Sequence, residues 1–424
     1  MPPLGRSCHA GERRRGIVAP MRTTARDIVI VGGGPAGLVT ALVAVTRTPT
    51  LAARIVVLEG ERYPRDKYCA GALGGRGERL LSTFSALPDV PRVTIRAASL
   101  EAGRGVREVR PEQPIGSVVR RVELDAGLAR LAGLRGVHIE QGVRVRELVR
   151  DPDGVRVVTS AGDLRAACVV GADGVGSVVR RGAFPLPQAR AQVLEIDTER
   201  VVHDGPADAV HFDLADPSFA GYFWDFPTPI DGKIHASRGV YVVKAPGESV
   251  DLDALLDARL RRIGLRLADH PKKRYGERGF PLEGNLSDAR TMLVGEAAGI
   301  DPVTGEGIAQ AIEYGVLAGD FLAAGHPVRA WTSVLRASRL GRDLRVRTLA
   351  LRPFYGAARA RALRLLEQRP ELLEAAARHF GGLPQRTGAL ALGALHVAKA
   401  ATVHRFSEAS DVPKALEIAR RFGQ

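Results

Sequence analysis

The residues whose spacing has the clearest chemical meaning lie near the N-terminus, in the run Gly32-Gly33-Gly34-Pro35-Ala36-Gly37. This run matches the GxGxxG pattern of a dinucleotide-binding turn. In that pattern Gly32 permits a tight turn, Gly34 lets the backbone approach a pyrophosphate, and Gly37 lets a helix pack closely against a strand. Glu59 follows about 20 residues later, where an acid accepts hydrogen bonds from ribose hydroxyls. Together these residues predict a site for the phosphates and ribose of a dinucleotide.

Elements suited to hold this turn flank it on both sides. Asp27–Val31 and Arg54–Leu58 are short apolar runs, as expected of buried parallel strands, and Leu38–Val45 between them is expected to be a helix. The turn therefore leads into a helix N-terminus, whose free N–H groups and dipole favour phosphate. A glycine-rich turn in some other α/β protein is the weaker alternative. Glu59 argues against a ribose 2′-phosphate, because like charges repel.

A second glycine-rich segment, Val294–Ile308, follows the expected buried strand Met292–Val294 and precedes a helix expected from Gly307. Glu296 at the end of that strand can bind a ribityl hydroxyl. Gly305 and Gly307 can bring backbone N–H groups to the pyrimidine edge of a flavin, where the positive helix end favours the charge of reduced flavin. The first turn does not separate FAD from NAD, and this second anion site favours FAD.

The second segment resembles the FAD-contacting segment of the p-hydroxybenzoate-hydroxylase-like flavoproteins, and in particular the GDAAG and TGEGI pattern of the geranylgeranyl reductase family. Other segments share that resemblance. They are Tyr63–Leu73 (similar to PR-x-K-x-CGG-x-L), Arg121–Leu128 (similar to R-x-x-F-D-x-x-L), Gly171–Gly174 (the DG motif) and Tyr222–Pro227 (similar to YxWxFP). The sequence departs from the family pattern at Glu296, where Asp is usual, and at Ala70-Gly71-Ala72, where paired glycines are usual.

The residues and the resemblance together imply an α/β fold, with a Rossmann-like FAD-binding domain, an inserted antiparallel β-sheet substrate domain and a helical C-terminal region. The resemblance implies hydride transfer from reduced flavin to a carbon–carbon double bond of a hydrophobic, prenyl-type substrate. Carried over position by position and joined with the glycine motifs, the cofactor-binding residues are Gly32, Gly34, Pro35, Ala36, Gly37, Glu59, Cys69, Ala70, Ala72, Arg121, Val145, Asp173, Gly295, Glu296, Gly305, Gly307 and Ile308.

Two residues of the expected Tyr63–Gly77 loop, Cys69 and Lys67, are candidate catalytic residues. Cys69 would lie beside the flavin and gate or protonate the substrate, or it is a small buried side chain. Lys67 would point to the flavin or to an anionic substrate, or it is a solvated loop lysine. Arg121 is expected to contact the flavin, with a surface position as its alternative.

Tyr222, Trp224 and Phe226 alternate along one expected strand and therefore share a face. They line an apolar substrate cavity, form core, or do both. Asp173 is expected to cap or orient the flavin loop rather than to react. The ten histidines show neither HxH nor HExxH spacing, so no metal site is expected.

Other functions are compatible with the same fold. A single-component monooxygenase acting on an aromatic or polyketide compound would share it, and the Cys69 loop and the YxWxFP segment favour the reductase over it. A flavin halogenase would need GWGxxTxP and WxWxIP segments, which the sequence lacks. A flavoprotein that carries a lipid without turnover is a further alternative. Because there is no second Rossmann fingerprint, NAD(P)H would bind transiently as electron donor, or a reduced electron carrier would serve.

The composition fits a globular protein of the cytoplasm. Of the 424 residues, 45% are hydrophobic and 25% are charged, and an aromatic content of 5% argues against nucleic-acid binding. The net charge of +14 suits an anionic ligand or membrane surface, although a solvated arginine-rich surface is the plainer interpretation. Cys8, Cys69 and Cys168 form no CxxC pair, which fits a reducing compartment. No signal peptide is recognised, and the apolar run Gly388–Val403 is expected to be a buried or interfacial helix.

The expected domain boundaries are discontinuous. They are 1–24 for a disordered extension, 25–80, 115–185 and 285–325 for the FAD-binding domain, 81–114 and 186–284 for the β-rich substrate domain, and 326–424 for the helical C-terminal region. Met1 and Met21 are both open as the start of the protein. The arginine-rich C-terminal region would dock peripherally on an anionic membrane or act as a lid over the substrate cavity.

Overall fold

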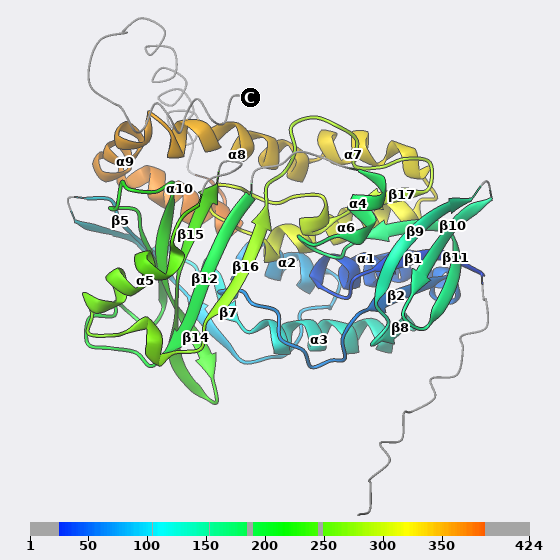
Figure 1. Cartoon of the computed structure of the whole chain (residues 1–424), viewed down its shortest axis with the longest axis horizontal. Helices are drawn as coiled ribbons and strands as arrows, with labels where there is room; N and C mark the ends of the chain where they lie inside the picture. Colours follow the sequence, from blue (N-terminus) through cyan, green and yellow to red (C-terminus); the bar gives the residue numbers. More distant parts are fainter. Residues whose placement is uncertain (1–24, 104, 152, 185–189, 245–248, 386–424) are drawn as a thin grey trace, which may run out of the picture.

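The structure is a computed structural model, and it describes residues 25–103, 105–151, 153–184, 190–244 and 249–385. The expected N-terminal extension with Cys8 and Met21 lies outside the described residues, as does the expected Gly388–Val403 helix. Figure 1 shows two large sheets toward opposite ends of the long axis.

The first sheet is mostly parallel and forms around the N-terminal strand. β1 (Ala25–Val31) pairs in parallel with β2 (Ile55–Glu59) and with β11 (Gly162–Gly171). Every residue of β2 is buried, and so are residues 28–31 of β1, which explains why both strands are continuous apolar runs. The other strands of this sheet are β8 (His138–Gln141), β9 (Val145–Asp151), β10 (Gly154–Thr159) and β17 (Thr291–Leu293).

Helices α1 (Pro35–Arg47) and α6 (Ile308–Ala323) pack against each other with almost no space between their backbones. A Cβ on Gly315 of α6 would lie 2.6 Å from the Cβ of Val39, and one on Gly319 would lie 2.6 Å from the Cβ of Val43. This register, 315 against 39 and 319 against 43, makes the two helices run parallel. Their positive N-terminal ends therefore lie at the same end of the first sheet.

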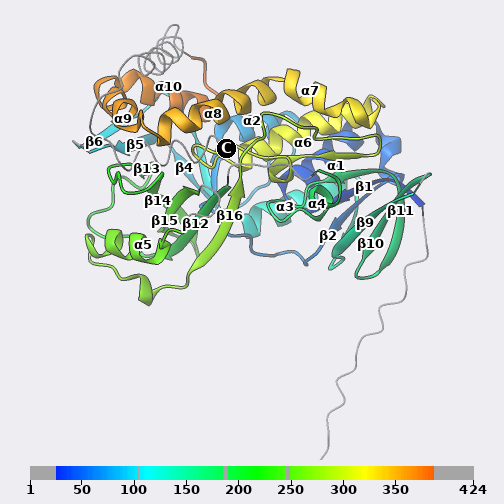
Figure 2. The same ribbon diagram turned by 45° about the horizontal axis from the view of Figure 1, so that its top comes forward.

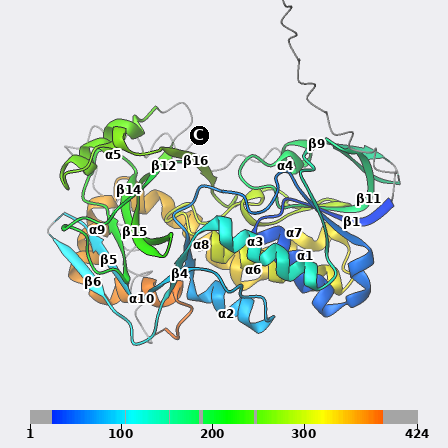
Figure 3. The ribbon, with the colours of Figure 1, turned by 90° about the horizontal axis from the view of Figure 1, so that it is seen from below.

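Three more helices accompany this part of the chain. α3 (Arg121–Leu134) packs on α1, and α2 (Gly75–Thr83) packs on α6. The short helix α4 (Val178–Ala183) follows β11. Figure 3 shows α1, α3 and α6 side by side.

The second sheet is mostly antiparallel, and its strands follow the order β16-β12-β15-β14-β13-β5-β6. Tyr222, Trp224 and Phe226 alternate with Phe223 along β14, so the two faces of the strand pack into different clusters. Phe223 packs toward α5 (Leu252–Arg261). The strand bounds are β5 (Ala97–Glu101), β6 (Val106–Val109), β12 (Arg190–Thr198), β13 (Ala209–Asp213), β14 (Gly221–Ile230), β15 (Lys233–Lys244) and β16 (Lys273–Arg278).

A small third sheet corrects one expectation from the sequence. Its strands are β3 (Ala72–Gly74), β4 (Arg92–Ile95) and β7 (Gly116–Val119). The expected Tyr63–Gly77 loop is therefore wrong beyond Gly71, because β3 follows at once and α2 begins at Gly75. The glycines there serve close packing: a Cβ on Gly74 would lie 2.6 Å from the Phe380 carbonyl oxygen.

The C-terminal part of the described chain is helical. α7 (Trp331–Ala337), α8 (Arg339–Tyr355), α9 (Arg359–Gln368) and α10 (Pro370–Phe380) run along one side of both sheets, as Figures 1 and 2 show. α10 contacts β5 and β6 of the second sheet. Of the helices that the structure describes, none combines the length and the apolar character needed to cross a bilayer.

Candidate active site

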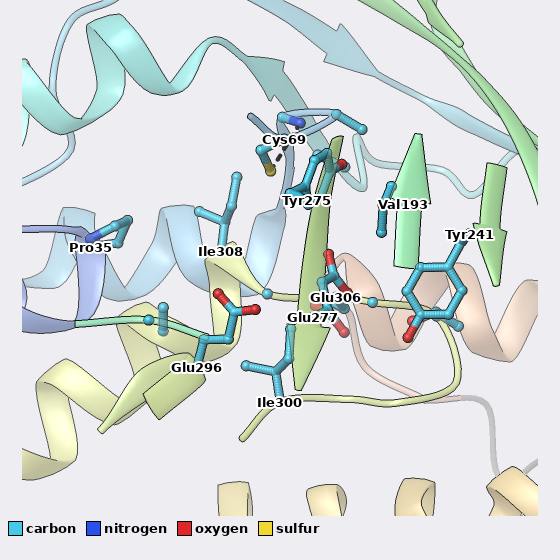
Figure 4. Close-up of a pocket in the computed structure, with 18 of the residues that line it drawn as sticks. Pro35, Cys69, Val193, Tyr241, Tyr275, Glu277, Glu296, Ile300, Glu306 and Ile308 are labelled. Carbon is cyan, nitrogen blue, oxygen red and sulfur yellow. Dashed lines mark hydrogen bonds between the residues drawn. The ribbon is translucent and has the colours of Figure 1, made fainter. Parts of the chain in front are cut away.

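A cavity of about 1710 Å³ is lined by residues of both large sheets. Its lining begins at the Gly32–Ala36 turn, passes Glu296 and the Gly305–Ile308 segment, and continues to the aromatic side chains of β14. The volume exceeds the roughly 300–1,000 Å³ of an ordinary small-molecule pocket, so the cavity has room for two ligands. Figure 4 shows its central part, with Pro35 and Glu296 on one side and Tyr241 on the other.

The turn after β1 is packed so tightly that only glycine fits at two positions. A Cβ on Gly32, where φ is +106°, would lie 2.4 Å from the Ala172 carbonyl oxygen, and one on Gly37 would lie 2.0 Å from the Gly32 carbonyl oxygen. A Cβ on Gly34 would meet only the Arg121 guanidinium, at 3.6 Å, because this side faces the cavity. Gly34 is the N-cap of α1 and supplies no side-chain cap, so the first N–H groups of the helix face the cavity for an anion.

The Glu59 carboxylate at the end of β2 is held by the chain itself. Its Oε2 accepts hydrogen bonds from Gly33 N and Arg65 Nη2, both at 3.0 Å. Arg65 Nη1 in turn donates to Asp125 at 2.9 Å, and Asp125 accepts two further bonds at 2.7 Å from Arg121. Two arginines and two acids therefore connect the end of β2 with the start of α3. These bonds hold the Arg121 guanidinium in place at the wall of the cavity.

Glu296 lies in a short 3₁₀ turn, Gly295–Ala297, directly after β17. Its Oε1 is buried and has no hydrogen-bond partner among the described residues. Burial raises the pKa of this carboxyl, and the nearby charges of Lys67 and Arg121 partly offset the rise. A buried carboxyl oxygen without a partner favours a ligand hydroxyl or other hydrogen-bond donor at this point of the cavity.

The glycine-rich segment before α6 lines the cavity with its backbone. Gly305 has a φ of +68°, and Gly307 is the N-cap of α6 without a side-chain cap. Tyrosine hydroxyls fix the carbonyl groups ahead of it, through the bonds of Tyr222 Oη to Thr304 O at 2.5 Å, Tyr241 Oη to Pro302 O at 3.0 Å and Tyr355 Oη to Val303 O at 2.7 Å.

The aromatic end of the cavity is formed by one face of the second sheet. The rings of Tyr222 and Tyr241, on neighbouring strands in register, stack at a centroid distance of 5.0 Å. Trp224 and Phe226 continue the same face of β14, and Phe212 meets Phe226 edge to face at 5.2 Å. The expected aromatic triad thus lines the cavity and also packs in a hydrophobic cluster.

The loop candidates also face the cavity. Cys69 Sγ accepts a weak hydrogen bond from Gly71 N at 3.4 Å, and burial raises the pKa of its thiol, with Arg121 partly offsetting the rise. Lys67 Nζ lies 5.6 Å from the ring centroid of Tyr275, within reach of a cation–π interaction. Lys67 is therefore not a purely solvated loop lysine.

Most residues expected to contact the cofactor or substrate border the same cavity. They are Gly32, Gly34, Pro35, Ala36, Glu59, Lys67, Cys69, Ala70, Ala72, Arg121, Val145, Asp173, Tyr222, Trp224, Phe226, Glu296, Gly305, Gly307 and Ile308. Gly37 and Gly295 do not border it and serve packing, since a Cβ on Gly295 would lie 2.7 Å from the Cβ of Ala36. Asp173 accepts bonds from Ser177 Oγ and Val178 N, which fixes the start of α4.

Several residues of the site were given no role by the sequence analysis. Arg65 and Asp125 belong to the ion-pair chain, and the i, i+4 spacing of Arg121 and Asp125 on a helix was a signal that could have revealed half of it. Tyr241 and Glu277 come from β15 and β16 and lie in no motif. Only the pairing of β14 with β15 and of β12 with β16 brings them to the cavity.

Comparison with known proteins gives a consistent set of relatives, although no family model matches the chain. A digeranylgeranylglycerophospholipid reductase of Methanothrix thermoacetophila is 29% identical over 321 residues, which are 70% of this chain and 77% of that protein. A menaquinone reductase of Mycobacterium tuberculosis is 29% identical over 350 residues, 77% of this chain and 83% of that protein.

Solved structures share the fold. A geranylgeranyl bacteriochlorophyll reductase-like protein from Thermoplasma acidophilum has a TM-score of 0.64 at 19% identity, covering 93% of this chain and 98% of that one. A flavin-dependent brominase has a TM-score of 0.65 at 18% identity, covering 90% of this chain and 100% of that one. A reductase-like protein and a flavin-dependent brominase therefore share this architecture, and the architecture alone does not choose between their activities.

Proposed function

We propose, from its membership of the geranylgeranyl reductase family of FAD-dependent oxidoreductases, that this protein reduces a carbon–carbon double bond in a prenyl-type lipid. The observation that carries the proposal is the continuity of the cavity. The glycine turn after β1 and the aromatic face of β14 border one space, so a dinucleotide and a long apolar substrate can meet inside it.

The polar groups of the cavity fit FAD. The N-terminus of α1 at Gly34 lacks a side-chain cap and would bind the pyrophosphate, and Glu59 lies where the adenosine ribose would be. Glu296 Oε1, without a partner among the described residues, would accept a bond from a ribityl hydroxyl. The N-terminal end of α6 at Gly307 would face the pyrimidine edge of the ring, where its positive dipole end favours negative charge.

When bound and reduced, the flavin supplies a hydride for the double bond. The chain's part is to bind, orient and exclude water. Tyr222, Trp224 and Phe226 offer an apolar surface for a prenyl chain, and the three phenols that hold the carbonyls of residues 302–304 keep the aromatic face and the flavin side in fixed relation. The electron donor in this proposal is NAD(P)H bound transiently, or a reduced carrier protein.

Anaerobic half-reactions test the function. The protein purified with FAD is reduced and then mixed, without O₂, with a lipid carrying geranylgeranyl chains. We expect the flavin to be reoxidised, with one double bond saturated per flavin and with no reoxidation by the fully saturated lipid. A protein whose flavin is reoxidised only by O₂, with an oxygenated aromatic product, would instead be the monooxygenase.

The rim of the cavity suits a substrate that resides in a membrane. Val346 and Leu349 of α8 border the cavity and are 64% and 56% exposed, and Arg342 borders it on the same helix. We propose that this rim contacts an anionic lipid surface from the cytoplasmic side. The double variant Val346→Asp with Leu349→Asp is expected to lower co-sedimentation with anionic liposomes by about tenfold or more, because each buried apolar side chain contributes roughly 1.5–3 kcal/mol.

The control for this experiment is the double variant Val106→Asp with Val202→Asp, which adds the same two negative charges at exposed valines that do not border the cavity. It should leave co-sedimentation unchanged. Equal loss in both proteins would assign the effect to net charge alone and would remove α8 as the contact.

A further inference from the structure

Glu277 is a carboxyl group in the cavity that none of the motifs explains. It lies on β16, two residues after Tyr275, and Figure 4 shows it between Glu296 and Tyr241. Its Oε2 is buried and has no hydrogen-bond partner among the described residues. A buried carboxyl without a partner lowers the stability of the fold. Its presence therefore indicates that a ligand or a reaction uses it.

Glu277 lies between the two ends of the cavity. A Cβ on Gly305 would lie 2.6 Å from Glu277 Oε2 and 3.0 Å from Tyr241 Cε2. The carboxyl therefore lies against the backbone that precedes α6, where the proposed flavin edge would be. On its other side begins the aromatic surface of Tyr241 and Tyr222, where the proposed prenyl chain would lie.

The charges around Glu277 come from four directions. Glu296 faces it from the turn after β17, Asp301 from the segment before α6, Glu195 from β12 and Lys67 from the loop before β3. Burial and the three acids together raise the pKa of Glu277 well above its ordinary range, and Lys67 only partly offsets them. Two of these acids are paired within the chain: Glu195 with Lys273 at 3.2 Å, and Asp301 with Arg347 at 2.6 Å.

We propose that Glu277 is the proton donor for reduction of the substrate double bond. The role rests on the proposed reductase function. The hydride from reduced flavin adds to one carbon with two electrons, and the π electrons of the double bond form the second C–H bond with the Glu277 proton. The O–H electron pair stays on the carboxylate, which takes up one proton from the solvent after turnover, so that each reduction consumes one solvent proton. A saturated C–C bond, oxidised flavin and an unchanged carboxylic acid are the balanced result.

Cys69 is the group that the sequence offered for the same task, and its surroundings fit it less well. Its sulfur already accepts a bond from Gly71 N, whereas the Glu277 oxygen accepts none from the described residues. Burial raises the pKa of both groups, but the reference pKa of a carboxyl is lower than that of a thiol, so at similar burial the carboxyl gives up its proton more readily.

The test compares Glu277→Gln with the unchanged protein in the FAD-loaded form. Gln keeps the volume and removes the acidic proton. We expect reoxidation of the reduced flavin by the geranylgeranyl lipid to slow by about 10²–10⁴-fold, the usual contribution of a general acid. FAD content, reduction of the flavin and lipid binding should stay as in the unchanged protein. The rate in the unchanged protein should fall as the pH rises through the pKa of Glu277, and the variant should show no such fall.

A second readout needs no turnover. The infrared spectrum of the oxidised holoprotein near pH 7 should contain a carboxylic-acid C=O band that is absent in Glu277→Gln. Glu277→Asp, which keeps the acid but shortens its reach, should recover part of the rate. The matched control is Glu123→Gln on α3, which removes another carboxyl whose Oε2 is buried without a partner among the described residues but which does not border the cavity, and it should keep the rate within about threefold.

The outcomes separate the two proposals. If the unchanged protein reduces the lipid and Glu277→Gln does so equally fast, or the infrared band is the same in both, Glu277 is not the donor and the reductase function stands. If the unchanged protein fails to reduce any prenyl lipid, the reductase function is wrong and the donor role falls with it.

Discussion

Gly37→Ala is expected to lose its bound flavin and a large part of its stability. The new Cβ would lie 2.0 Å from the Gly32 carbonyl oxygen and 3.2 Å from the Cβ of Ala172, and the first of these contacts is with backbone, which cannot rotate away. α1 would have to move off β1 and carry its N-terminus away from the phosphate position. Overpacking of this kind costs roughly 1–3 kcal/mol and occasionally more. The measurements are the flavin absorbance of the purified protein and its denaturation midpoint.

The control is Gly182→Ala in α4, where a new Cβ would meet nothing within 4 Å. Alanine is a better helix former than glycine by roughly 0.5–1 kcal/mol, so this variant should be as stable as the unchanged protein or slightly more stable. It should also keep its flavin. A Gly37→Ala protein that retains flavin at the normal ratio would mean that close packing of α1 on β1 does not set the phosphate position.

What the sequence could predict was local. The strand, turn, helix and acid between Asp27 and Glu59 follow one another directly, so the period of the apolar residues and the glycine spacing suffice to assign them. The aromatic alternation of Tyr222, Trp224 and Phe226 was readable for the same reason. For the strand-helix segment around Glu296, the prediction of a flavin site rested mainly on the resemblance to a family.

What the sequence could not predict depends on contacts between distant segments. Glu277 stands out only because β12 and β16 pair and because the acid then lacks a partner among the described residues, and no spacing in the chain signals either fact. The Arg65 bridge between Glu59 and Asp125 likewise exists only in the folded chain. The Tyr63–Gly77 loop was predicted too long because glycines that allow close packing look the same in sequence as glycines that allow turns.

The arginine content was interpreted mainly as a solvated surface, and for several arginines this is wrong. Arg359 of α9 is 8% exposed and donates to four backbone carbonyls, among them that of Phe219 just before β14 and that of Gly221 at its start. Arg76 and Arg378 are also buried. Part of the positive charge thus ties the C-terminal helices to the sheets, because a guanidinium can satisfy several acceptors at once.

Arg347→Met is the substitution in this group with the largest expected effect. Arg347 on α8 pairs with Asp301 at 2.6 Å, with Asp343 at 3.1 Å and with Glu306 at 3.3 Å. Asp301 and Glu306 belong to the segment whose backbone enters the cavity before α6. Arg76 of α2 supports the same cluster through Glu306 at 3.0 Å.

The expected cost of Arg347→Met is about 3–5 kcal/mol, because three acids of a largely buried cluster lose their shared cation. The Arg347 side chain is only 19% exposed, so solvent does little to compensate. Flavin affinity should fall as well, since the segment from Asp301 to Gly307 loses its tie to α8. Arg345→Met changes an exposed arginine of the same helix and should stay within about 0.5 kcal/mol of the unchanged protein.

The pH dependence of this loss distinguishes an electrostatic tie from simple packing. Burial raises the pKa of Asp343, but His379, Arg347 and Arg76 outweigh it, so that its pKa lies below the ordinary range. A carboxyl with a lowered folded-state pKa stabilises the fold above the unfolded-state pKa of about 3.9, and that contribution disappears as the pH falls through the folded-state value. The difference in unfolding free energy between the unchanged protein and Arg347→Met should therefore be largest near neutral pH and shrink below about pH 4. If this difference in unfolding free energy stays constant down to pH 3, Arg347 acts through the packing of its apolar stem. The segment before α6 would then be held against α8 by packing and not by the charge cluster.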